Sequence, residues 1–452
     1  MSGAIPVSTP PICTLDPWIA ARIRGNGAAS VPLTRRELLG HQMRELRATL
    51  ARVLEFSKFY GEHLAGVDPG AVRAPADLAA LPLTRESDLR QRSQDMLCVG
   101  QDEVARIMTL MSSGTTGPAK RLHFSAQDLE RTVDFFHHGM QGLIEPGQTV
   151  LILLPGPSPD STGDLLARAL ARMQVRAAVH GLVTDAEAAL AAFEAARPHC
   201  VVGLPVHLLL LAGLARARSM DARLQSILLC SDYIPASISE RLAAMTGAKV
   251  FSHYGTVETG LGGGVECAAL CGCHLREADM FLEIVDPDTG GVLWPGQWGE
   301  IVVTTLGREA MPLVRYATGD LGRIMGGQCP CGSILQRLDK VRGRRACMPD
   351  MANGARLDLA RLDEALFGLD GLLDYQATLD RSRPEEVLRL EILALPGLEQ
   401  GLCKVVRQRL AALPELQDAA GGPGPGVEVA AATSGLRPLQ IAKRVIGIKE
   451  KQ

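Results

Sequence analysis

Apolar residues recur at spacings of three and four along residues 34–66, among them Leu39, Met43, Leu46 and Leu50. This is the period of one face of an α-helix that packs on a core, so the segment is predicted to be a helix with a packing role. The later stretch DLAALPLTRESDLR predicts a helix, a break at Pro82 and a second helix that Thr84 caps.

From about residue 120 to residue 250, short apolar runs alternate with longer amphipathic segments. Phe124 closes a first short strand, and Ser125 is predicted to cap a helix that runs to about Leu143. The predicted strands that follow are Thr149–Leu154, a strand near Ala177, His199–Val202 and Ser226–Cys230, and the predicted helices between them include Asp164–Met173 and Asp185–Ala196. Such alternation indicates a mostly parallel sheet that helices cover on both faces.

The pattern changes twice more towards the C-terminus. Residues 280–325 contain short strand patterns separated by Gly, Asp and Pro turns, which predicts a β-rich subdomain. From Val341 a loop, a helix, a strand, a further helix and a glycine-proline stretch predict a small α+β domain. We therefore predict an α/β fold with a large N-terminal domain of mostly parallel sheets, helices and a β-rich subdomain (residues 1–340) and a small mobile α+β domain (residues 341–452).

Composition limits the partners of this fold. The chain has 452 residues, 46% of them hydrophobic, and a formal net charge of −3, so it can bury two or more cores but has no global basic field for nucleic acid or anionic lipid. No apolar run reaches about 18 residues without a charge, and the N-terminus lacks a basic start followed by an apolar core. We expect a cytoplasmic protein with small-molecule partners, no nucleic acid and no membrane, with a homodimer as an alternative to a monomer.

The stretch Met111–Lys120, MSSGTTGPAK, concentrates hydroxyls, glycines and a cation in ten residues. Glycines without a Cβ can turn their N–H groups towards an anion, hydroxyls donate to it, and lysine adds charge. The residues that would do so are Ser112, Ser113, Gly114, Thr115, Thr116, Gly117 and Lys120. The spacing is not that of a Walker loop, and a plain surface turn is the alternative. The motifs downstream favour a phosphate loop.

Taken in order, these motifs resemble those of the adenylate-forming acyl-ligase superfamily, and within it the phenylacetate-CoA ligase branch. SSGTTGPAK is similar to its phosphate loop, HYGTVE to its adenine and metal motif, YATGD to its ribose motif, and QRLDKVRGR to the hinge before a mobile C-terminal domain. DLAALPLTRESDLR and CPCG match the branch more narrowly. The resemblance covers nearly the whole chain.

This resemblance implies that the protein uses ATP to convert a carboxylate into an acyl adenylate and then transfers the acyl group to coenzyme A. Such a catalyst must neutralise phosphate charge. Glu258 would hold Mg²⁺, Asp320 would accept from the ribose hydroxyls, and Tyr254 would offer an aromatic face to adenine. The other residues that the resemblance places at the nucleotide or the forming acyl phosphate are Gly255, Thr256, Asp232, Arg337 and Lys443.

Three departures from the family pattern leave a second function open. Val257 stands where the family has a hydroxyl residue, so Thr256 would have to replace that donor. Ala346 and Cys347 stand at acidic hinge positions, and Ile441 occupies the place of the adenylation lysine, two residues before Lys443. The alternative is therefore an adenylyl-transfer or nucleotide-binding protein that forms no thioester.

Cysteine spacing predicts a structural zinc site. Cys267 and His274 lie in the loop after HYGTVE, and Cys329 and Cys331 flank a proline in a later turn, so folding can bring together a Cys₃His tetrahedron. Some members of the resembled branch hold zinc at matching positions. Cys271 or Cys273 can replace one of these ligands, and buried free thiols are the other interpretation.

The acid cannot be read from the sequence. Family resemblance favours a small aromatic or otherwise apolar carboxylate, in a pocket lined by GLPVHLLL, His253 and the glycine run Gly260–Gly264. His137 and His138 are neighbours on a predicted helix and do not face the same way, so they make a poor metal site.

Overall fold

The computed structural model describes residues 13–25, 32–110, 119–156, 158–418, 422–432 and 444–451. The chain divides into two compact units. Unit 1 comprises residues 1–142, 251–318 and 322–340, and unit 2 comprises residues 143–250, 319–321 and 341–452.

Unit 1 begins with the helices α1 (Leu15–Arg24), α2 (Arg35–Phe56) and α3 (Lys58–His63). Thr34 and Glu37 form a capping box at the start of α2, each satisfying a backbone N–H of the other. The single helix predicted over residues 34–66 is wrong, because Ser57 takes an extended conformation, ends α2 and caps α3 by accepting from the Tyr60 N–H.

The predicted role of Thr84 as a helix cap is also wrong. After α4 (Pro75–Leu78), helix α5 (Glu86–Arg92) begins behind Arg85, whose N–H donates to Asp88. Thr84 is fully buried, donates its hydroxyl proton to the Val314 carbonyl at 2.7 Å and lies 3.2 Å from the Tyr60 hydroxyl. The Thr84 hydroxyl therefore bonds to a carbonyl far along the chain and does not cap the helix that follows it.

Strands β1 (Arg106–Leu110) and β2 (Lys120–Phe124) form an antiparallel hairpin in unit 1. The predicted phosphate loop connects them, and its residues Ser112, Ser113, Gly114, Thr115, Thr116 and Gly117 lie outside the described residues. Ser125 then caps α6 (Ala126–Met140), as predicted. Lys120, the last residue of the predicted loop, is therefore the first residue of β2.

The β-rich part predicted for residues 280–325 is present in unit 1. Strands β10 (Met280–Val285), β11 (Gly299–Thr305) and β12 (Tyr316–Gly322) form one sheet, with residues 319–321 of β12 counted in unit 2. Strands β7 (Lys249–Tyr254), β8 (Gly264–Glu266), β9 (Cys273–Leu275) and β13 (Arg337–Leu338) pair antiparallel in that order.

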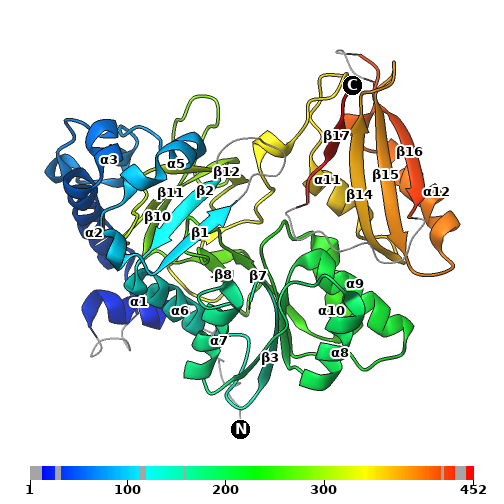
Figure 1. The fold of residues 1–452 in the computed structure, drawn as a ribbon, viewed down its shortest axis with the longest axis horizontal. Helices are drawn as coiled ribbons and strands as arrows, with labels where there is room; N and C mark the ends of the chain where they lie inside the picture. Colours follow the sequence, from blue (N-terminus) through cyan, green and yellow to red (C-terminus); the bar gives the residue numbers. More distant parts are fainter. Residues whose placement is uncertain are drawn as a thin grey trace, which may run out of the picture. The chain divides into compact units, whose positions relative to one another are not determined.

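Unit 2 contains the predicted parallel strands, β3 (Thr149–Leu153), β4 (Arg176–Val179), β5 (Cys200–Gly203) and β6 (Ser226–Leu229), in the order β6-β5-β3-β4. Helix α7 (Thr162–Arg172) lies on one side of them, and α8 (Ala186–Ala196), α9 (Pro205–Ala217) and α10 (Ala236–Thr246) lie on the other (Figure 1). Strands β3, β5 and β6 are buried along their whole length, as two helical covers require, and the edge strand β4 is less buried.

The C-terminal part of unit 2 is a four-stranded sheet in the order β16-β15-β14-β17, formed by β14 (Leu372–Asp380), β15 (Val387–Ala394), β16 (Gly426–Ala431) and β17 (Gly447–Lys449). Helices α11 (Leu359–Leu366) and α12 (Glu399–Ala411) accompany it. One apolar core joins this part to α9 and α10, and Gly213 of α9 has no room for a Cβ beside Leu373 of β14.

The predicted mixed α/β class is confirmed by this arrangement of parallel strands, helices, β-rich segment and α+β C-terminal part. The boundary predicted at Val341 is one of the points where the chain passes between units, and its role as a functional domain boundary stays a prediction.

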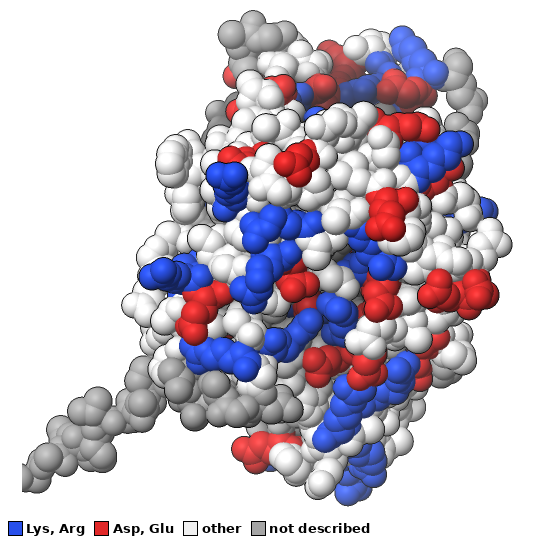
Figure 2. Space-filling model, turned by 90° about the vertical axis from the view of Figure 1, so that its left-hand side faces the viewer, with Lys and Arg blue, Asp and Glu red and all other residues white. Residues whose placement is uncertain are grey.

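Surface charge and helix composition bear on partners. On the face shown in Figure 2, Lys and Arg are interspersed with Asp and Glu, as the small net charge leads one to expect. Among the described residues, none of the helices combines the length and apolar character that crossing a membrane requires.

Candidate active site and metal centre

The end of the β1–β2 hairpin is tied to the HYGTVE motif by a buried ion pair. Lys120 donates through Nζ to Glu258, and the two residues are 2% and 1% exposed. Tyr316 also donates its hydroxyl proton to the same carboxylate oxygen of Glu258 at 3.2 Å. The structure therefore joins the last residue of the predicted phosphate loop to the predicted magnesium ligand.

Local geometry explains the residues around Glu258. Gly255 lies so close to the Leu261 carbonyl and the His253 ring that a Cβ would not fit. The Thr256 N–H donates to the Thr259 hydroxyl at 2.9 Å, and the Thr256 hydroxyl accepts from the Thr259 N–H at 3.3 Å. The proton of the Thr256 hydroxyl can still be donated, as its predicted replacement of the missing donor at Val257 requires.

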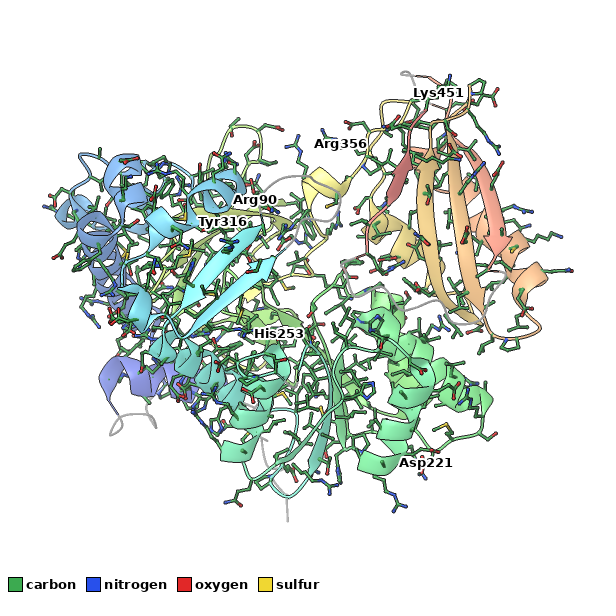
Figure 3. The ribbon with its side chains drawn as sticks, viewed as in Figure 1. Arg90, Asp221, His253, Tyr316, Arg356 and Lys451 are labelled. Carbon is green, nitrogen blue, oxygen red and sulfur yellow. The ribbon has the colours of Figure 1, made fainter. Side chains whose placement is uncertain are left out.

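Tyr254 and His253 end strand β7 in different surroundings. Tyr254 is buried beside Gly263, whose Cα hydrogen leaves the ring room that a Cβ would take. The His253 ring lies 6.1 and 6.4 Å from the rings of Phe135 and Phe136, and burial lowers its pKa to about 4 (Figure 3). The imidazole is therefore uncharged at pH 7, and its Nε2 is buried without a hydrogen-bond partner.

In unit 2, the buried Asp320 of YATGD pairs with Arg344, whose Nε lies 3.2 Å from its Oδ1. Backbone bonds join the hinge to the same strand, because the Leu321 N–H donates to Gly343 and the Arg342 N–H donates to Leu321. Arg344 was missing from the candidate residues, although it stands within the hinge motif QRLDKVRGR. A cation held on the predicted ribose carboxylate is a candidate nucleotide contact.

Arg337 has partners that differ from those predicted. Its guanidinium is buried and donates to the carbonyls of Cys271, Gly326 and Gly327 at 2.8, 3.2 and 3.1 Å. It therefore fastens the two loops that carry the cysteines, and its role at the nucleotide stays a prediction.

Asp232 lies beside a buried charge cluster of unit 2. Its Oδ1 accepts from the Tyr233 N–H at 2.8 Å. Burial, and to a smaller extent the charge of Asp232, raise the pKa of Asp363 to about 6, against the opposing effect of Arg444. Arg444 donates to Asp363 at 2.7 Å and fixes the C-terminal tail there. Lys443, which precedes it in sequence, lies outside the described residues.

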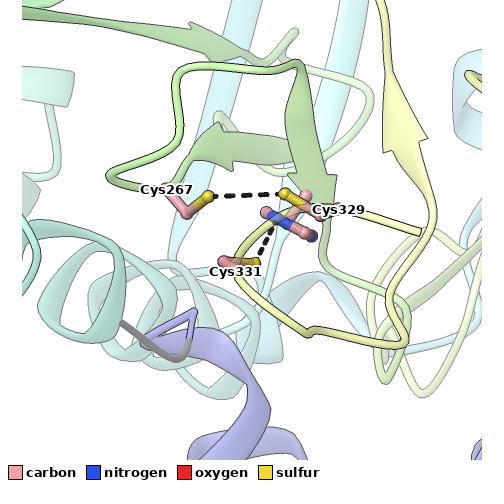
Figure 4. Close-up of side chains that lie close together, drawn as sticks. Cys267, Cys329 and Cys331 are labelled. Carbon is pink, nitrogen blue, oxygen red and sulfur yellow. Dashed lines mark hydrogen bonds between the residues drawn. The ribbon is translucent and has the colours of Figure 1, made fainter. Parts of the chain in front are cut away.

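The four predicted zinc ligands converge in unit 1. The ligand atoms of Cys267, His274, Cys329 and Cys331 all lie within 4.8 Å of one another, and all four residues are buried (Figure 4). The sulfurs of Cys267 and Cys329 are 3.8 Å apart, and the Cys331 sulfur is 3.4 Å from the His274 Nε2. Tetrahedral zinc with bonds of about 2.3 Å to sulfur and about 2.0 Å to nitrogen places such atoms about 3.8 and 3.5 Å apart. The donor set fits zinc.

The pKa values of His274 and Cys267 bear on whether these side chains can bind a metal ion. Burial lowers the pKa of His274 to about 4, so its imidazole is neutral at pH 7 and can ligate. Burial raises the pKa of the Cys267 thiol to about 12, so a cation must displace its proton. Cys271 instead accepts from Arg337, and Cys273 donates to the Ser252 carbonyl. Cys13, which sequence spacing does not connect with this cluster, is also buried. Burial raises the pKa of its thiol, and the nearby Cys267 and Cys331 raise it further.

The chain is similar to known proteins over most of its length. A family model described as AMP-binding enzyme matches residues 47–308. Phenylacetate-coenzyme A ligase of Thermus thermophilus is 32% identical over 323 residues, which are 69% of this chain and 71% of that protein. Phenylacetate-coenzyme A ligase of Escherichia coli is 27% identical over 357 residues, 76% of this chain and 80% of that protein.

Among solved structures, 2-hydroxyisobutyryl-CoA ligase in the postadenylation state with 2-HIB-AMP matches with a TM-score of 0.76 at 21% identity, covering 91% of this chain and 89% of that one. The same enzyme with 2-HIB-AMP and CoA in the thioesterification state matches with a TM-score of 0.65 at 20% identity, covering 92% and 91%. At such identities the likeness is one of fold.

The Lys120–Glu258 pair yields a stability prediction. Lys120→Met should lower the free energy of unfolding by about 3–5 kcal/mol, because it leaves the Glu258 carboxylate buried without its counter-charge. Denaturant unfolding of the purified variant measures this difference. The exposed Lys58 provides a matched control, and Lys58→Met should change stability by less than about 0.5 kcal/mol.

A double variant separates charge from packing. Lys120→Met with Glu258→Gln should recover most of the lost stability, because no unpaired charge remains buried. If the double variant is as unstable as Lys120→Met alone, the carboxylate does not depend on Lys120 for its burial.

Proposed function

The chain belongs to the AMP-binding enzyme family, in its phenylacetate-CoA ligase-like branch, and we propose that it couples an organic carboxylate to coenzyme A through an acyl adenylate. The observation that carries the proposal is the buried contact between Lys120 and Glu258, residues 138 positions apart. One follows the predicted phosphate loop and the other is the predicted magnesium ligand, so both would act on the same phosphates.

In the first half-reaction, the carboxylate attacks the α-phosphorus of ATP, the bond to pyrophosphate breaks and an acyl adenylate forms. Lys120 neutralises phosphate charge once Glu258 releases it, and bound Mg²⁺ would supply the charge that Glu258 needs in exchange. Asp320 accepts from the ribose hydroxyls, and Arg344 orients its carboxylate. In the second half-reaction, the thiol of coenzyme A displaces AMP to form the thioester.

We propose a small aromatic or otherwise apolar acid as substrate. The support is the neutral His253 beside Phe135 and Phe136, which offers an aromatic, uncharged wall next to the nucleotide motif. A largely aromatic, uncharged wall favours an apolar acyl group and gives no counter-charge to a second carboxylate. We also propose that the protein works in the cytoplasm, because a reducing compartment keeps free thiols such as these from forming disulfides.

The function predicts acid-dependent exchange of labelled pyrophosphate into ATP, followed by thioester formation when coenzyme A is added. A panel of aromatic, branched aliphatic and dicarboxylic acids should show exchange with the aromatic or apolar monoacids and little with the dicarboxylic ones. Exchange without a thioester would favour the alternative, an adenylyl-transfer or nucleotide-binding protein. Absence of exchange with every acid would contradict acid activation.

The C-terminal lysine yields a kinetic prediction. Lys443→Ala should slow pyrophosphate exchange at least about tenfold, or about 1.4 kcal/mol of barrier, because charge develops on the acyl phosphate as pyrophosphate leaves. ATP affinity should stay unchanged. Lys451→Ala, an exposed tail lysine, is the matched control and should be neutral. Equal rates for the two variants would exclude Lys443 from catalysis and favour the alternative function.

We also propose that Cys267, His274, Cys329 and Cys331 hold a structural zinc ion, since four protein ligands leave no open position. Freshly purified, reduced protein should contain about one zinc per chain. Cys329→Ser should lose the metal and much of its thermal stability, because binding is coupled to folding.

A cysteine outside the cluster provides the control for this prediction. Cys403→Ser on α12 should keep both zinc and stability. Metal analysis that finds no zinc in the unaltered protein would leave the cluster as four buried free side chains.

A further inference from the structure

Unit 1 contains a small polar cavity behind the turn that carries Glu258. Helix α6, Thr259 and Gly260 of the turn, the start of β10 and the end of β11 line it. The centres of water-sized atoms can occupy about 30 Å³ of it, which is more room than one water molecule needs. Apart from Thr259, which bonds to Thr256, and Gly260 of the glycine run, none of the residues that line it was given a role above.

Arg308 is the side chain that makes the cavity unusual. It is 8% exposed, lies with its guanidinium 4.8 Å from the centre of the Phe124 ring, and lines the cavity beside Gly260. Its Nη1 is completely buried and has no hydrogen-bond partner. Burial lowers the pKa of Arg308 to about 10, which still leaves the group charged at pH 7. Buried guanidinium groups are normally paired, because an unpaired charge is costly to desolvate.

The carboxylates near Arg308 are already occupied. Asp279 is contacted by Arg276 at 2.6 Å, Arg22 at 2.5 Å and Arg131 at 3.6 Å. Asp128 accepts from the backbone N–H groups of Ser125, Glu309 and Ala310, and Glu258 is paired with Lys120. The charged residues that line the cavity are thus three arginines, Arg131, Arg276 and Arg308, and two aspartates, which leaves one more positive than negative charge.

We propose that this cavity binds one small inorganic oxyanion, such as phosphate, with Arg308 as its main ligand. A guanidinium presents paired N–H donors that match the oxygens of such an anion, and Arg131 Nε, also buried without a partner, offers another donor from α6. The excess positive charge repels metal ions, and the volume excludes a nucleotide. The site is distinct from the acid-activating chemistry and does not depend on it.

An anion in this cavity would lie next to the turn that carries Glu258. Thr259 and Gly260 line the cavity and directly follow Glu258, and Thr132 of α6 donates to the Gly260 carbonyl at 2.9 Å. An anion bound to Arg308 would therefore hold the back of the turn whose front carries the predicted magnesium ligand.

The test uses the full chain and inorganic phosphate, with potassium chloride keeping the ionic strength constant. The unfolding temperature of the unaltered protein should rise with phosphate concentration, and the apparent Kd should weaken at least about tenfold in Arg308→Met. Without phosphate, Arg308→Met should be at least as stable as the unaltered protein, because it removes an unpaired buried charge and keeps an apolar contact with Phe124. Arg36→Met, at an exposed arginine of α2, should behave as the unaltered protein.

A second titration distinguishes this cavity from the predicted nucleotide site. With saturating ATP and no acid, the phosphate-dependent rise in unfolding temperature should persist, and Arg308→Met should again weaken the apparent Kd for phosphate at least about tenfold. Loss of the rise in ATP would place the phosphate in the nucleotide site and overturn the proposal. An equal rise in Arg308→Met, or no rise in the unaltered protein, would overturn it as well.

Discussion

The buried contact between Lys120 and Glu258 is the interaction on which the rest of the candidate site depends. It connects the β1–β2 hairpin to the turn that follows β7. The end of the predicted phosphate loop therefore lies next to the predicted nucleotide motif. Each charge stabilises the other in the interior, and the Tyr316 hydroxyl also donates to Glu258. In the proposed function, the phosphates would take Lys120 as partner and a magnesium ion would take Glu258, so neither charge would be left unpaired in the interior.

The need of a buried charge for a partner also distinguishes two buried arginines of unit 1. Arg315 is 2% exposed, and its guanidinium contacts both oxygens of Glu283 at 3.1 Å and donates to the Ala79 carbonyl at 3.0 Å. Arg308 is buried almost as deeply and has an aromatic ring on one face but no acceptor at Nη1. A chain that pairs Arg315 so fully has no structural reason to leave Arg308 unpaired, so an acceptor supplied from solution is the simplest account.

Sequence patterns predicted those parts of the fold that local physics determines. Apolar runs located β3, β5 and β6, Ser125 was correctly predicted to cap α6, and short cysteine spacings located the cluster of three cysteines and His274. Tertiary contacts decided the rest, as Thr84 shows, since its acceptor lies 230 residues away. Strand β14 was missed although its buried Tyr375, Ala377 and Leu379 alternate with less buried neighbours, a signal that the sequence does contain. Arg344 was missed because a hinge motif does not reveal which arginine will face Asp320.

The C-terminal departure from the family pattern can be explained by how the tail is anchored. Strand β17 runs parallel to β14, and Arg444 is held by Asp363, by the Tyr375 carbonyl at 3.3 Å and by the rings of Phe367 and Tyr375. Burial of a guanidinium among such partners fixes the backbone at residue 444 more firmly than β17, three residues long, would alone. The position of a catalytic cation then depends on its distance from this anchor. The proposed role of Lys443 therefore requires its side chain to cover the two residues that separate it from the family position.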